Sequence, residues 1–75
     1  MNQLNLYHIF YTVAQCGNIS AAAKKLYISQ PAVSKSISRL EESFASPLLI
    51  RSSRGVTLTE NGQLLYKHLD TAFQA

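Results

Sequence analysis

The stretch SAAAKKLYISQPAVSKSISRLEESF, residues 20–44, decides the fold because it contains two helical segments separated by very few residues. Three consecutive alanines follow Ser20, and alanine combines the highest helix propensity with a smooth surface for a neighbouring helix. Ser20 is predicted to cap the first helix, over 21–27. Ser29 is predicted to cap the second, whose first turn tolerates Pro31. This arrangement predicts a helix-turn-helix.

The second of these helices has two different faces. Its apolar residues recur at spacings of four, three and four, which predicts one stripe directed at the core: Val33, Ile37, Leu40 and Phe44. The opposite face carries small or hydrogen-bonding side chains in its first two turns. Such a helix start suits the major groove of DNA. The predicted base-contacting residues are Gln30, Pro31, Ser34, Lys35 and Ser38.

Each of these side chains has chemistry that a base edge can meet. Gln30 can pair with adenine through two hydrogen bonds, and Lys35 can donate to O6 or N7 of guanine. Pro31 and Ser34 are compact enough to approach a base edge or a thymine methyl group. The alternative is an ordinary capped helix whose polar groups are only solvated.

Basic residues gather in the middle of the chain. Six of the seven Lys and Arg residues lie between positions 24 and 54, where only Glu41 and Glu42 oppose them, so this segment carries +4 in a chain of net charge +3. Such clustering predicts a face that meets a polyanion. Lys24, Lys25 and Arg51 are equally compatible with phosphate proximity and with solvation or local ion pairing. The residues predicted to contact the DNA backbone or minor groove are Ser20, Ser29, Arg39, Arg51 and Arg54.

Further elements are predicted on both sides of this segment. Helical spacing of apolar residues predicts another helix before this pair, over residues 4–16, which is ended by Gly17 and Asn18. Two short strands, 48–51 and 56–58, flank the turn 52–55 and form a hairpin. Thr59 is predicted to cap a last helix from Glu60 onward. The apolar side of that helix comprises Leu64, Leu65, His68, Leu69, Ala72 and Phe73.

Composition excludes several classes of protein. A length of 75 residues suits one small domain, and its apolar runs are far shorter than the ~20 residues of a membrane span. Residues 1–25 do not read as a signal peptide, so the cytoplasm is the predicted compartment. Cys16 is the single cysteine and is predicted to be a small buried residue. His8, Cys16 and His68 lack metal-ligand spacing, and neither catalytic residues nor a cofactor is predicted. A protein-interaction module remains the main alternative to DNA binding.

The sequence closely resembles the LysR-type transcriptional regulators. The resemblance rests on the runs 17–23, 29–35, 47–51 and 58–62, together with Leu26, Ile37 and Leu40-Glu41, and it extends over essentially the whole chain in the right order. The most specific part of the resemblance is Ser29 to Ala32, at the start of the second helix of the helix-turn-helix. The chain departs from the usual family pattern at Ala45, where glycine is common, at Leu48-Leu49, where Leu-Phe is common, and at Lys35, where arginine is common.

The resemblance implies a mainly α, winged helix-turn-helix fold with a three-helix core, a two-stranded β-wing and a C-terminal linker helix. It implies a double-stranded DNA partner, a DNA-binding domain over residues 1–58, and the beginning of a linker helix over 59–75 that pairs two subunits. Full-length members usually assemble further into tetramers and carry a ligand-sensing domain, which this chain lacks. Because no stop signal precedes Ala75, we expect the chain to end inside this helix. Its predicted dimer contacts are Leu65, Leu69, Ala72 and Phe73.

Overall fold

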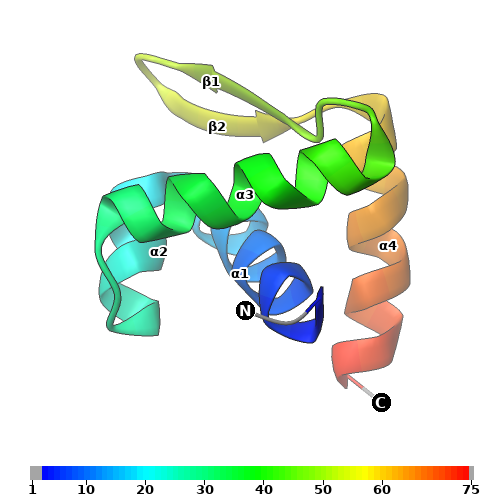
Figure 1. Cartoon of the computed structure of the whole chain (residues 1–75), viewed down its shortest axis with the longest axis horizontal. Helices are drawn as coiled ribbons and strands as arrows, with labels where there is room; N and C mark the ends of the chain where they lie inside the picture. The colour runs from blue at the N-terminus through cyan, green and yellow to red at the C-terminus, as the bar shows by residue number, and fades with distance from the viewer. Residues whose placement is uncertain (1–2, 75) are drawn as a thin grey trace.

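A computed structural model describes residues 3–74 of the chain, with side chains from residue 5 onward. Four helices surround a common core, and a small hairpin lies along one of them (Figure 1). In chain order the elements are α1 (Gln3–Cys16), α2 (Ile19–Leu26), α3 (Gln30–Phe44), β1 (Leu49–Ser52), β2 (Gly55–Leu58) and α4 (Glu60–Gln74). This is the predicted winged helix-turn-helix, and all six predicted elements are present.

Helix α1 supplies the centre of the core, and α2, α3 and α4 all pack against it. Phe10 and Val13 of α1 are fully buried against Ala22 of α2 and against Val33 and Ile37 of α3. The alanines thus allow close packing of α2, as predicted. The predicted helix over 4–16 began at Leu4, whose side chain lies outside the described residues. Cys16 is half-buried beside this core.

The predicted cap of α2 is wrong. Asn18, rather than Ser20, caps this helix, and its Oδ1 accepts the backbone N–H of Ala21 at 2.6 Å. Gly17 alone ends α1, with a φ of 77° and its N–H donated to Val13, so Asn18 is free to begin the next helix at once. Consequently α2 begins at Ile19 and ends at Leu26. Tyr27, predicted to be helical, instead adopts a left-handed conformation after the helix.

The apolar stripe of α3 is confirmed over three of its four residues. Val33, Ile37 and Leu40 are fully buried, whereas Phe44 remains 42% exposed at the end of the helix. Phe44 is the last residue of α3, and its ring meets the half-buried Tyr7 at the edge of the core, with 6.3 Å between ring centroids. The predicted cap is confirmed, because Ser29 Oγ accepts the N–H of Ala32 at 3.2 Å.

The hairpin is antiparallel and is held to the helices at its base. Strands β1 and β2 pair from Leu49 with Leu58 to Ser52 with Gly55, which leaves residues 53 and 54 as the turn. Oε2 of Glu41 accepts the N–H groups of Leu48 and Leu49 at 2.7 and 3.2 Å. One of the two acids of the basic segment therefore ties the end of α3 to the first strand.

Helix α4 begins at a confirmed cap and returns along α1. Thr59 Oγ1 accepts the N–H of Gly62 at 3.0 Å and donates to the carbonyl of Pro47 at 2.8 Å. Further along, the Tyr11 ring stacks on Tyr66 with 5.1 Å between centroids, and its hydroxyl donates to Asp70 at 2.7 Å. This hydrogen bond to a carboxylate raises the pKa of Tyr11. Aromatic stacking and one polar contact thus hold the two helices together.

Ala45 adopts an unfavourable backbone conformation, with a φ of 51°, where it ends α3. A side-chain Cβ in this left-handed region costs about 1 kcal/mol, which glycine avoids. We therefore expect Ala45→Gly to raise the free energy of unfolding by about 1 kcal/mol in urea denaturation. Ala72→Gly, in the last turn of α4, has no positive φ to relieve and should lower the free energy of unfolding. A loss of stability in Ala45→Gly would contradict this assignment of strain.

Candidate nucleic-acid interface

The first two turns of α3 present their predicted base-contacting side chains on the surface. Gln30, Pro31, Lys35 and Ser38 are exposed, and Ser34 is half-buried. At 100° per residue, Pro31, Lys35 and Ser38 lie opposite the buried stripe, while Ser34 lies on the flank next to the hairpin. The structure thus brings Pro31, Ser34, Lys35 and Ser38 to one side of the helix, whereas Gln30, its first residue, lies 100° before Pro31 around the axis.

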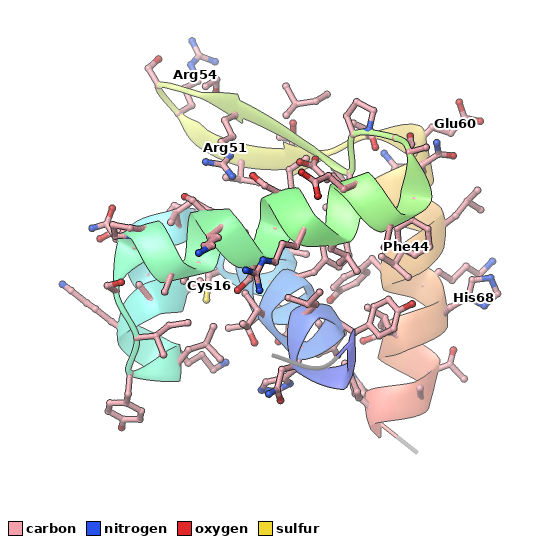
Figure 2. All side chains as sticks on the ribbon, viewed as in Figure 1. Cys16, Phe44, Arg51, Arg54, Glu60 and His68 are labelled. Carbon is pink, nitrogen blue, oxygen red and sulfur yellow. The ribbon has the colours of Figure 1, made fainter. Side chains whose placement is uncertain are left out.

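The hairpin adds two arginines beside this face, and they behave differently. Arg54 lies in the turn, is exposed, and points away from the body of the protein (Figure 2). Arg51 lies on β1 between the hairpin and α3, and its Nη1 donates to Ser34 Oγ at 3.2 Å. The hairpin and the start of α3 therefore form one basic surface, in which Arg51 already contacts a predicted base-contacting residue.

The remaining predicted backbone contacts are distributed around this surface. Arg39 is exposed on the flank of α3 that faces away from the hairpin. Ser29 is exposed, but its hydroxyl already accepts the N–H of Ala32. Ser20 is exposed in the first turn of α2 and has no capping role. Lys24 and Lys25 are exposed in the last turn of that helix.

The predicted dimer contacts of α4 divide into two groups. Leu65 and Leu69 pack against the core of their own chain, and Phe73 meets the rings of His8 and Tyr11 edge-on. Ala72 is exposed. Leu64 was predicted to share this apolar side but turns outward and is 56% exposed.

A groove of about 330 Å³ lies between the end of α3 and α4. Its lining includes the exposed Phe44 and Leu64, together with His68. Figure 2 shows Phe44 directed from α3 towards α4. Sequence reasoning missed this groove because it assigned Phe44 to the core and grouped Leu64 with the inward side of α4.

The described part of the chain contains neither a metal-binding cluster nor a membrane-spanning helix. Within residues 3–74, no three His, Cys, Asp or Glu side chains come together as metal ligands. No helix in the same range is long and apolar enough to cross a membrane.

Comparison with known proteins gives one consistent family. Residues 4–63 match the family described as "Bacterial regulatory helix-turn-helix protein, lysR family". Among curated proteins, the chain is 44% identical over 62 residues to the nitrogen assimilation regulatory protein nac of Klebsiella aerogenes, covering 83% of this chain and 20% of nac. It is 49% identical over 57 residues to the transcriptional regulator TdcA of Escherichia coli K12, covering 76% of this chain and 18% of TdcA.

The solved structures agree with this result. The crystal structure of a "CbnR_DBD-DNA complex" has a TM-score of 0.90 and 33% sequence identity, covering 97% of this chain and 84% of that one. The chain spans about a fifth of the length of the curated relatives it matches. With the family match covering most of its residues and the fold agreeing throughout, the chain belongs to the lysR family of regulatory helix-turn-helix proteins.

Proposed function

We propose that this chain is the DNA-binding domain of a LysR-type transcriptional regulator and that it binds double-stranded DNA in a sequence-specific manner. The observation that carries the proposal is the joint surface of α3 and the hairpin. Gln30, Pro31 and Lys35 are exposed at the start of α3, and Ser34 in the same turns contacts Arg51 of β1. The DNA complex of the structurally similar CbnR domain supports the same assignment.

In this proposal α3 enters the major groove with its first two turns. Its small and hydrogen-bonding residues then face base edges, whereas Glu41 and Glu42 lie in the last turn, away from the phosphates. The carboxylate of Glu41 also accepts hydrogen bonds from the backbone N–H groups of Leu48 and Leu49. The exposed turn of the hairpin reaches the minor groove or the backbone through Arg54.

Selection of bound sequences from a random DNA pool tests the proposal. We expect enrichment of one half-site, repeated with two-fold symmetry if the protein binds as a dimer. The same selection reports the spacing of the half-sites. Absence of a mobility shift with mixed-sequence DNA at low salt would refute DNA binding and favour the alternative of a protein-interaction module.

Arg54→Ala should weaken binding to all sequences with little loss of selectivity. A phosphate contact releases about 0.9 of a counterion, so its loss should flatten the slope of log K against log salt by about one unit. Binding titrations at several salt concentrations measure this slope. Lys67→Ala removes the same charge from an exposed position on α4 and serves as the control. A strong change in base preference for Arg54→Ala would instead indicate readout of bases by the hairpin turn.

We also propose that the chain forms a homodimer through α4. A paired linker helix needs apolar surface on its outer side, and Leu64, Phe44 and the groove between them supply it. Ala72 extends the available surface towards the end of the helix. Leu65, Leu69 and Phe73 contribute by fixing α4 on α1, so that its outer side is presented in one orientation.

Leu64→Asp should abolish this dimer while leaving the fold intact, because the side chain is exposed. Sedimentation equilibrium of the wild-type chain and the variant measures the change, and Ser53→Asp adds the same charge in the exposed hairpin turn as a control. Leu69→Asp is a poorer test, since Leu69 packs against the core and its loss would destabilise the monomer. A wild-type chain that sediments as a monomer would refute the proposed dimer.

A further inference from the structure

The contact between Arg51 and Ser34 joins two parts of the protein that are 17 residues apart in sequence. Arg51 is in register with Val56 on β2, and Val56 donates its N–H to the carbonyl of Gly17 at 2.8 Å. The hairpin is therefore attached to the α1–α2 junction at the level of Arg51. Because this attachment is internal to the protein, the position of Arg51 beside α3 is set before any DNA arrives.

The hydroxyl of Ser34 differs from those of two other serines in the same helix. Ser36 donates its proton to the carbonyl of Ala32 at 2.9 Å, and Ser43 donates to the carbonyl of Leu40 at 2.8 Å. Ser34 instead accepts a proton from Arg51. Among the described residues, the Ser34 hydroxyl donates to no acceptor, so its proton remains available to a group on the DNA.

The polarity of this hydrogen bond has a consequence for recognition. A guanidinium group has five N–H donors and no acceptor, so in this contact Ser34 can only accept. A free serine hydroxyl can donate or accept and therefore reads base edges ambiguously. When Ser34 accepts from arginine, one of its two lone pairs is used and a positive charge lies beside the hydroxyl, which disfavours the approach of a second donor. The hydroxyl then favours donation to an acceptor such as guanine O6 or thymine O4 over acceptance from the amino group of cytosine.

We infer that Arg51 is a specificity-determining positioning residue, which sets Ser34 as a hydrogen-bond donor towards the DNA. The inference rests on the proposed DNA binding. It differs from the sequence-based expectation that Arg51 contacts the DNA backbone. In that case its guanidinium would neutralise a phosphate and contribute equally to every DNA sequence.

A double-mutant cycle in the full chain separates the two roles. The variants are Arg51→Met, which keeps the apolar stem but removes every donor, Ser34→Ala, and the double variant. Competition binding against single-base changes in the selected half-site measures discrimination at each position. We expect Arg51→Met to reduce discrimination about three- to tenfold at the one position that Ser34→Ala also affects. The double variant should then match Ser34→Ala at that position.

Controls distinguish this result from a general effect. Arg54→Met removes an arginine from the hairpin turn, without a contact to Ser34, and should leave discrimination at this position unchanged. Circular dichroism checks the fold of each variant. If Arg51→Met does not fold, Arg51→Lys is tested in its place. Its shorter side chain keeps the positive charge, so a loss of discrimination at an unchanged salt slope supports the inference.

Two results would overturn the inference. One is a uniform loss of affinity in Arg51→Met with a salt slope flatter by about one unit and unchanged discrimination, which identifies a phosphate contact. The other is that Arg51→Met and Ser34→Ala reduce base discrimination at different positions of the half-site, with effects that simply add in the double variant. If the wild-type chain selects no sequence at all, the proposed function fails together with this inference, and that failure is seen before any variant is made.

Discussion

Replacing Gly62 with alanine is expected to lower the free energy of unfolding by about 3 kcal/mol, a large part of the stability of a domain this small. Gly62 lies in the first turn of α4, where an ideal Cβ would overlap the carbonyl oxygen of Leu48. That carbonyl accepts the N–H of Thr59 at 3.1 Å, and the Leu48 N–H is held by Glu41. Because the obstacle is backbone fixed at both ends, a side-chain rotation cannot relieve the overlap.

Thermal and urea denaturation followed by circular dichroism measure this effect. For a domain of this length, 3 kcal/mol corresponds to a fall of roughly 12–24 °C in Tm. Gly17→Ala is the matched control, since residue 17 has a positive φ of 77° but an added Cβ would meet nothing within 4 Å. It should cost only about 1 kcal/mol. Equal losses in the two variants would mean that α4 moves away from Leu48 without penalty.

Lys35→Ala is expected to weaken binding to the selected DNA sequence by about 1–3 kcal/mol and to relax base preference at one position of each half-site. Lys35 is exposed opposite the buried stripe of α3, in the second turn after the cap, within the part of a groove-bound helix that comes closest to the bases. Its ammonium group is a point donor, without the planar fork of the arginine that is common in the family.

Fluorescence anisotropy with the selected sequence and with a scrambled one measures both affinity and discrimination. Lys67→Ala controls for the loss of one positive charge. Lys35→Arg should sharpen the preference for guanine, because two parallel hydrogen bonds to O6 and N7 become available. An equal loss of affinity for both DNA sequences in Lys35→Ala would assign this residue to a phosphate instead of a base.

Local patterns predicted most of the secondary structure because they report interactions within a few residues. The stripe through Val33, Ile37 and Leu40 requires only helical spacing, and the caps Ser29 and Thr59 bond to backbone groups three residues ahead. The cap of α2 was predicted wrongly. Asn18 and Ser20 are both suitable caps, and the choice between them depended on how α1 ends at Gly17.

The candidate interface was predicted in part. Helical periodicity was sufficient to bring Pro31 and Lys35 to one exposed face, and Gln30 is exposed at the first position of the same helix. Periodicity could not place Phe44 and Leu64, because a residue at an apolar position is buried only if another element covers it. Both lie beside the groove between α3 and α4, where the described chain leaves them exposed.

By itself, the sequence determined the order of elements, the inward face of α3 and the family, all of which follow from short-range spacing and from motifs in their order along the chain. The tertiary structure alone decided the contacts between distant segments. Arg51 meets Ser34, Glu41 holds Leu48, and Gly62 fits against a carbonyl only because packing around α1 brings separate elements within hydrogen-bonding or van der Waals distance. Side-chain type indicates which contacts are chemically possible, and the packed backbone selects the ones that form.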